Sequence, residues 1–291
     1  MCGAATEENL IIGQRLNKSV GLTPRKKYGI SVSVMRCRSC GLIYANPLPI
    51  PADIQDHYGI PPDEYWVQSQ IDIDSDSFLV EIEKAKRILG PDNNLMALDI
   101  GVGQGKSTNA LLRAGFDTYG IEPSESFRNF AIKSFGLDPE KLKLGTVEEA
   151  DYPENFFDFI TFGAVLEHLY NPSACIAKAM KWLRPGGIIQ IEVPSANHLI
   201  SKLINYYYRI SGTNYVTNLS PMHVPFHLYE FDLKSFEKLS KELNYDVIEY
   251  YYFICEIYHL PKFMHPFLRF LMQKNKSGMQ LEVWLKKRST C

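Results

Sequence analysis

The chain has 291 residues, which corresponds to about two domains of roughly 150 residues each or to one larger α/β unit. Hydrophobic residues make up 45% of the sequence and charged residues 22%, which is typical of a folded globular protein and excludes disordered, collagen-like and disulfide-dense classes. The 31 basic and 33 acidic residues give a net charge of −2. Because nucleic-acid binding generally relies on excess positive charge, we expect no nucleic-acid partner.

The start of the chain lacks the basic and apolar regions of a secretory signal. No run of about 18 apolar residues occurs, so we expect no spanning membrane segment and a cytoplasmic location. The six cysteines are unremarkable in number, and only Cys37 and Cys40 have an informative spacing.

Residues 1–75 are predicted to form a small N-terminal module of short strands and turns. Ile30, Val32 and Val34 alternate with small or polar residues, and five prolines between positions 47 and 62 disfavour a helix afterwards. Apolar residues at helical spacing then predict a helix over 78–89, which ends at Gly90-Pro91. We expect the second domain to span residues 76–291.

Strands and helices alternate regularly from residue 95 onwards. The predicted strands are 95–100, 118–121, 157–162 and 188–193, and the predicted helices are 106–114, 124–135 and 171–183. Asn171 is a good N-cap with Pro172 in the first turn. This alternation predicts an α/β fold with a parallel sheet covered on both faces.

The C-terminal part is predicted to contain a helix that begins after Asp232, followed by strands at 246–253 and 279–286. An antiparallel edge strand would suit this ending. Two aromatic inserts interrupt the pattern, at about 196–230 and 254–277. The first insert is expected to cap a ligand site, because ligands of α/β sheets bind beyond the carboxyl ends of the strands. The second is expected to pack on the sheet or on a second subunit, as in a homodimer, with a membrane surface as the alternative.

The most informative stretch is the loop after the first strand of this domain, which reads DIGVGQGKST over residues 99–108. A dinucleotide fingerprint would need glycine where the chain has Lys106. A phosphate-binding P-loop would need its first glycine where the chain has Ile100. The pattern that does fit is an acidic residue followed by alternate glycines, namely Asp99, Gly101, Gly103 and Gly105.

This pattern resembles the first motif of the class I S-adenosylmethionine-dependent methyltransferases. Glycines let the backbone approach the cofactor, and a carboxylate at the strand end can bind its ammonium group directly or through water. Glu122 ends the second strand, where an acid can accept both ribose hydroxyls. Residues 158–172, which include Gly163, resemble the fourth-strand segment of the family, and residues 183–188 resemble the turn into its fifth strand.

The resemblance implies a doubly wound, mostly parallel seven-stranded sheet of order 3-2-1-4-5-7-6, with the last strand antiparallel. It also implies that Val147 and Glu148, after the third strand, lie at the adenine, with Gly163 in the cofactor site. The implied reaction is methyl transfer from S-adenosylmethionine to a small-molecule acceptor, either a sugar or another biosynthetic intermediate. The alternatives are a quinone or lipid precursor as acceptor, and a non-catalytic cofactor-binding or assembly protein.

Two further groups of residues are candidates for chemistry. The Cys37-Cys40 pair resembles the second knuckle of a zinc ribbon that precedes some of these methyltransferases, and Cys2 offers a third ligand. Three alternatives remain open for the fourth ligand: a truncated start, His57, or loss of the metal. For the general base, the candidates are His227, His168 and His223, since an imidazole can accept a proton at neutral pH.

Overall fold

A computed structural model describes residues 1–3, 9–18, 23, 25–26, 29–51, 78–90, 94–257 and 260–289. His57, the suggested fourth metal ligand, lies outside the described residues. No helix in this described part is long and apolar enough to cross a membrane.

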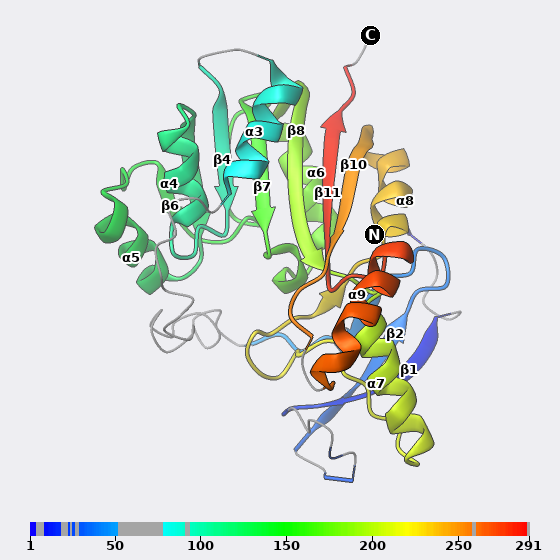
Figure 1. Cartoon of the computed structure of the whole chain (residues 1–291). Coiled ribbons are helices and arrows are strands. Elements are labelled where there is room, and N and C mark those ends of the chain that lie inside the picture. The colour runs from blue at the N-terminus through cyan, green and yellow to red at the C-terminus, as the bar shows by residue number, and fades with distance from the viewer. Residues whose placement is uncertain are drawn as a thin grey trace.

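The centre of the molecule is a seven-stranded sheet with the predicted order and orientation (Figure 1). From one edge to the other, its strands are β6 (Leu142–Leu144), β5 (Asp117–Glu122), β4 (Met96–Ile100), β7 (Phe157–Gly163), β8 (Leu183–Pro194), β11 (Gln280–Lys287) and β10 (Tyr245–Phe253). The strands from β6 to β8 are parallel, and β11 is antiparallel to both of its neighbours. The sequence-based prediction of the sheet is therefore confirmed.

Helices cover both faces of this sheet. Helices α3 (Leu79–Leu89) and α4 (Lys106–Arg113) share one apolar cluster with Phe159 and Trp284. On the opposite face, α6 (Pro172–Trp182) and α8 (Leu233–Leu243) pack against a larger cluster that includes Ile160. Neighbours such as Phe159 and Ile160 face opposite sides, so strands buried on both faces appear as continuous apolar runs. Helix α5 (Glu125–Phe135) packs near the β6 edge.

Side-chain caps fix where three of these helices begin. The side chains of Ser124, Asn171 and Asp232 each accept a hydrogen bond from a backbone N–H in the first turn of α5, α6 and α8. Such a cap typically stabilises a helix by about 1 kcal/mol. The structure confirms the predicted Asn171 cap and the helix start behind Asp232.

A second, four-stranded antiparallel sheet combines the N-terminal region with the first aromatic insert. Its strands, in order, are β1 (Leu10–Leu16), β2 (Ser31–Arg36), β3 (Ile43–Asn46) and β9 (Tyr229–Glu230). Val34 and Ile43 form a small core with Val216 and Leu219 of the insert. The N-terminal module and the insert therefore share one hydrophobic core. The domain boundary at residue 75 stays a prediction, since residues 52–77 lie outside the described part.

Both aromatic inserts contain a helix that the sequence pattern did not predict. Helix α7 (Leu199–Ile210) lies in the first insert, and α9 (His265–Lys274) follows the 3-10 turn η4 (Lys262–Met264) in the second. The two helices lie side by side below the central sheet (Figure 1) and share an apolar cluster.

Candidate active site

A cavity of about 680 Å³ lies at the carboxyl ends of β4, β5 and β7. This is the edge at which the strand order reverses, where open α/β sheets bind their ligands. Its volume is in the range of small-molecule sites. Eight of the predicted site residues line it: Gly101, Gly103, Glu122, Val147, Glu148, Gly163, His168 and His227. Asp99, Gly105 and His223 are not among the lining residues.

The glycine loop after β4 is held in a conformation that favours glycine. Gly101 has φ = 77°, and an added Cβ would collide with Val165 Cγ2. Gly105 caps α4, and its added Cβ would lie 2.8 Å from the Cβ of Ala131 on α5. Gly101 thus allows Val165 to pack against the loop, and Gly105 allows α4 and α5 to pack closely.

Glu122 places a buried carboxylate in the cavity wall at the end of β5. Its Oε2 accepts a hydrogen bond from the backbone N–H of Gly103, and its Oε1 accepts one from Ser124, both at 2.8 Å. Burial raises the pKa of Glu122 to about 7, although these two hydrogen bonds oppose the rise. Each carboxylate oxygen has a second lone pair with which to accept a ligand hydroxyl. The arrangement suits a ligand that donates two hydrogen bonds.

Asp99, near the end of β4, is buried and does not line the cavity. Its Oδ2 accepts a hydrogen bond of 2.6 Å from the hydroxyl of Thr108 on α4. Burial raises the pKa of Asp99 to about 6. Asp99 therefore joins the glycine loop to the first turn of α4, and its predicted contact with the cofactor ammonium stays a prediction.

The segment after β6 forms the opposite wall of the cavity. Val147 is buried there, and Glu148 follows it at the cavity edge. Thr146 and Glu149 hydrogen-bond to one another and fix this turn. The backbone oxygen of Glu148 accepts a hydrogen bond of 2.6 Å from Lys178. The turn is thus held from two sides, with the Glu148 side chain exposed at the rim.

His168 and His227 meet at the end of the cavity beyond β7. Their ring centroids are 4.9 Å apart in an edge-to-face arrangement, although the residues are far apart in the sequence. The backbone N–H of Leu228 donates to the carbonyl of Glu167, which fixes the insert against the short helix η3 (Leu166–His168). The structure therefore brings two of the three predicted base candidates together.

Glu167 is a buried acid between these two imidazoles, and its role was not predicted from the sequence. Its Oε1 lies 3.7 Å from His227 Nε2 and 4.0 Å from His168 Nε2. Within the described residues, its Oε2 is buried without a hydrogen-bond partner. An acid directly before a histidine at a strand end was the available signal, but sequence alone does not show that the acid points inward.

Burial changes the protonation of this cluster. It raises the pKa of Glu167 to about 8 and lowers the pKa of His227 to about 3, with a further lowering by His168 and His223. Near neutral pH the Glu167 and His227 pair therefore holds one proton and no net charge. The neutral imidazole of His227 can accept a proton from a bound ligand.

His223 contacts a residue of the N-terminal sheet and does not line the cavity. Its Nε2 lies 3.4 Å from a guanidinium nitrogen of Arg15 on β1. Burial, together with the nearby Arg15 cation, lowers the pKa of His223. These contacts tie the insert to the N-terminal sheet.

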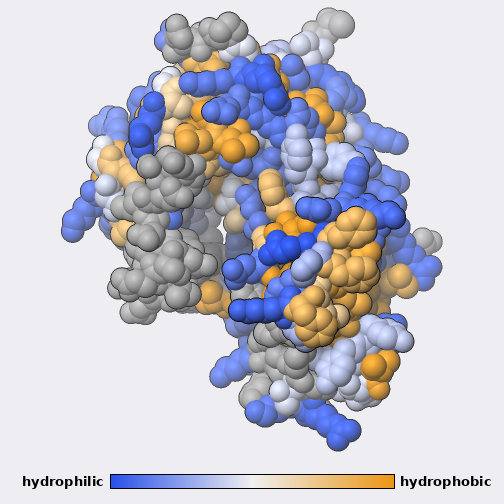
Figure 2. Space-filling view, in the orientation of Figure 1, coloured by the Kyte–Doolittle hydropathy of each residue, from blue (hydrophilic) through white to orange (hydrophobic). Residues whose placement is uncertain are grey.

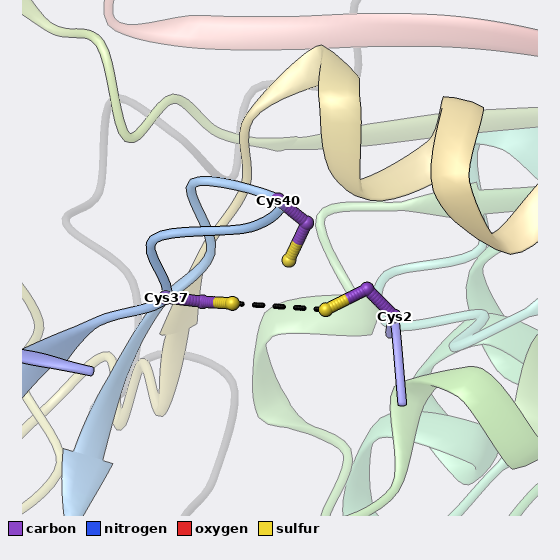
Figure 3. A group of neighbouring side chains, drawn as sticks. All are labelled: Cys2, Cys37 and Cys40. Carbon is purple, nitrogen blue, oxygen red and sulfur yellow. Dashed lines mark hydrogen bonds between the residues drawn. The ribbon is translucent and has the colours of Figure 1, made fainter. Parts of the chain in front are cut away.

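The three predicted metal ligands, Cys2, Cys37 and Cys40, converge near α8 (Figure 3). Figure 3 shows Cys2, Cys37 and Cys40 with their sulfur atoms pointing toward one another. The Cys2 and Cys37 sulfurs are 3.6 Å apart. The backbone N–H of Cys37 donates to the carbonyl of Leu42, and the backbone N–H of Gly41 donates to the carbonyl of Cys37. These two hydrogen bonds form the tight turn that contains Cys37 and Cys40.

Two groups of side chains in the described part of the chain could hold a metal ion. One is the cysteine cluster, and the other is Glu167 with His168 and His227. In each group the potential ligand atoms lie within 4.8 Å of one another. Three thiols suit a soft or borderline ion such as zinc.

Comparison with known proteins identifies the family. The first relative is a ubiquinone biosynthesis O-methyltransferase from Methylococcus capsulatus, 30% identical over 128 residues, which are 43% of this chain and 52% of that protein. The protein of the same name from Bradyrhizobium diazoefficiens is 30% identical over 40% of this chain and 47% of its own length. The chain thus spans about half the length of these curated relatives.

A solved structure and a family model were also compared with the chain. The structure of a SAM-dependent methyltransferase from Archaeoglobus fulgidus superposes with a TM-score of 0.51 over 74% of this chain and 95% of that one, at 14% identity, which shows a common fold. A family model described as a methyltransferase domain matches residues 80–250, more than half of the chain. The chain therefore belongs to the methyltransferase-domain family.

Proposed function

We propose that this protein transfers a methyl group from S-adenosylmethionine to a hydroxyl group of a small, largely apolar acceptor. The observation that carries the proposal is the cavity itself, which combines a glycine-rich loop, the buried Glu122 carboxylate and the His168 and His227 pair. These features lie at the ends of adjacent parallel strands, where such ligands bind.

The cofactor half of the cavity is the part next to β4 and β5. Glu122 would accept hydrogen bonds from both ribose hydroxyls, and Val147 and Glu148 would contact the adenine. Gly101, Gly103 and Gly163 would leave room for the methionine part of the cofactor. Bound S-adenosylmethionine supplies an electrophilic methyl group on a sulfonium ion.

The acceptor half is the part next to η3 and the insert. Its wall contains Val165, Leu169, Tyr170 and Pro225 together with the two histidines. An apolar wall favours a flat aromatic acceptor over a sugar, which would need several polar partners. The names of the relatives point to a quinone precursor as acceptor and to transfer onto oxygen. A sugar acceptor, which the sequence suggested first, is the second candidate.

The histidines provide the proton acceptor for this reaction. Neutral His227 would take the hydroxyl proton as the oxygen attacks the methyl group, and loss of the Glu167 proton to solvent would leave a carboxylate to stabilise the resulting imidazolium. A positioned base typically accelerates a reaction about 10²- to 10⁴-fold. Alignment of two bound reactants can contribute roughly 7 to 11 kcal/mol. Alignment is therefore expected to provide the larger share.

The experiment is turnover with a catechol-type quinone precursor in the variants His227→Ala and His168→Ala. We expect at least one variant to lose 100-fold or more in kcat while it keeps the dissociation constant for S-adenosylmethionine. Near wild-type rates in both variants between pH 6 and 9 would contradict base catalysis. Loss of wild-type activity with a chelator, restored by Mg²⁺, would instead assign Glu167 and the histidines to a metal ion. No turnover on any acceptor would favour a non-catalytic cofactor-binding protein.

We also propose that Cys2, Cys37 and Cys40 hold a structural zinc ion. The support is the convergence of three sulfurs from two distant segments and the tight turn that presents Cys37 and Cys40. Zinc would bind the three thiolates, and its binding free energy would stabilise the folded state. The fourth ligand stays open.

Metal analysis tests the zinc site without any reference to activity. Protein purified without chelator should contain about one zinc per chain, and Cys37→Ser should release it. Cys255→Ser is the matched control, because Cys255 lies outside the cluster. Absence of zinc from the wild-type protein, or equal zinc in Cys37→Ser, would contradict the site.

A further inference from the structure

Helices α7 and α9 each carry exposed apolar residues in addition to the apolar residues that they bury. In α9 and the η4 turn before it, Leu268 and Met272 are buried against α7. By contrast, Phe263, Phe267 and Phe270 are 83%, 62% and 59% exposed. Figure 2 shows these hydrophobic side chains gathered over α9 on the face in view. A surface helix of a globular protein normally buries its only apolar stripe, so the outer row needs an explanation.

Helix α7 continues the same surface. Ile200, Ile204 and Tyr208 are buried in the cluster shared with α9. The outer face again holds large apolar or aromatic residues, namely Leu203, Tyr206, Tyr207 and Ile210. We call the outer residues of α7, η4 and α9 the α7–α9 surface.

The segments that contain α7 and α9 carry basic residues and no acidic ones. Residues 196–229 and 257–281 contain six of the 31 basic residues and none of the 33 acidic ones. Lys262, Arg269 and Lys274 are exposed beside the three phenylalanines, and Lys202 and Arg209 are exposed on α7. This region is therefore basic although the net charge of the chain is −2, and it coincides with the exposed aromatic row.

We propose that the α7–α9 surface docks the protein on an anionic lipid bilayer. Exposed phenylalanines can enter the boundary between headgroups and acyl chains, while tyrosines remain at headgroup level. The basic residues beside them attract anionic headgroups, at about 1 kcal/mol for each one near the surface. This combination of apolar residues and unopposed positive charge defines helices that lie on a membrane.

Two other occupants fit this surface less well. A two-fold contact with a second copy would bring the basic residues of one surface against those of the other. Single-stranded nucleic acid could stack on the phenylalanines, but Leu203 and Ile210 offer it no stacking surface. An anionic bilayer satisfies both the apolar and the basic part of the surface.

The surface is also connected to the proposed active site. The insert that contains α7 also contains Pro225 and His227, which line the cavity. Docking would therefore place the acceptor end of the cavity on the segment that touches the lipid, which would suit an acceptor dissolved in the bilayer. The docking itself does not depend on the proposed reaction.

The test is co-sedimentation with vesicles of phosphatidylglycerol and phosphatidylcholine, compared with phosphatidylcholine alone. The wild-type protein should bind the anionic vesicles, and added salt should weaken the binding. Two triple variants remove the two components separately: Phe263→Ser, Phe267→Ser, Phe270→Ser, and Lys262→Glu, Arg269→Glu, Lys274→Glu. We expect each to lose binding, the charge variant by about 100-fold or more.

Matched controls carry the same number of changes on other exposed positions. They are Ile11→Ser, Ile50→Ser, Val80→Ser for the apolar set, and Lys234→Glu, Lys238→Glu, Lys241→Glu on α8 for the charge set. Both controls should bind vesicles like the wild-type protein. All variants should keep their circular dichroism spectrum and affinity for S-adenosylmethionine, so a failure of docking remains distinct from a failure of the methyltransferase proposal.

Three outcomes would overturn the proposal. The first is no binding of the wild-type protein to anionic vesicles. The second is equal loss of binding in the control variants. The third is a dimer, or an oligonucleotide complex, that requires the three phenylalanines while vesicle binding does not.

Discussion

Replacement of Glu122 by alanine should weaken S-adenosylmethionine binding about 100-fold. In the proposed complex the Glu122 carboxylate accepts a hydrogen bond from each ribose hydroxyl. A hydrogen bond to a charged group contributes roughly 1.5 to 3 kcal/mol, so the lower value for two bonds gives about 3 kcal/mol. A difference of 1.4 kcal/mol is a factor of ten in affinity. Glu122→Gln, which keeps one acceptor oxygen, should lose less than Glu122→Ala.

Isothermal titration calorimetry at pH 8 measures this difference directly. Glu125→Ala is the matched control, because Glu125 lies three residues further on, exposed in the first turn of α5 and outside the cavity. It should bind like the wild-type protein. Because Glu122 also accepts from Gly103 and Ser124, circular dichroism should confirm that the variants remain folded. A wild-type dissociation constant in folded Glu122→Ala would refute the ribose assignment.

The pH dependence follows from the same carboxylate. Burial raises the pKa of Glu122 from 4.5 to about 7 in the folded protein. The contribution of this group to the stability of the cofactor-free protein is therefore greatest below pH 4.5. The unfolding free energy should fall by up to about 3 kcal/mol as the pH rises through 7. The cofactor needs the ionised form, so its affinity should fall about tenfold per pH unit below 7. Glu122→Gln should flatten both curves. Equal slopes in the wild-type protein and in Glu122→Gln would show that another group titrates.

Three further changes test separate parts of the site. Gly103→Ala should weaken cofactor binding at least tenfold. Gly115→Ala is the control, because Gly115 also has a positive φ and an added Cβ would meet open space there, so its affinity should not change. Equal affinities in the two variants would contradict the predicted close approach of the loop to the cofactor. Glu167→Gln should lower kcat tenfold or more with an unchanged cofactor dissociation constant, and an unchanged kcat would remove Glu167 from the reaction. Thr108→Val should lower the unfolding free energy by about 1 to 3 kcal/mol in urea titrations, since it leaves the buried Asp99 carboxylate without that bond; no loss would show that the bond is dispensable.

The sequence predicted the central sheet well because the relevant signals are local. Strands buried on both faces give short apolar runs, and residues such as Asn171 and Asp232 mark where helices begin. The glycine loop was also readable, because its pattern follows a strand directly. These features depend on neighbours in the sequence, so a single chain suffices to find them.

The remaining parts of the site depend on contacts between distant segments. The orientation of Asp99 toward Thr108 follows from strand alternation, since Leu98 and Ile100 belong to the cluster on the opposite face. The position of Glu167 depends on the insert that brings His227 against η3. Helices α7 and α9 lie inside the two inserts and pack against each other, a contact between distant segments that the sequence does not show.

The most direct test of the central claim is a calorimetric titration of the wild-type protein with S-adenosylmethionine, S-adenosylhomocysteine and ATP. We predict one site per chain that binds S-adenosylmethionine and its homocysteine product in competition, with no binding of ATP. Absence of binding by both sulfur compounds, or binding of ATP at the same cavity, would contradict the assignment of this cavity to a methyltransferase.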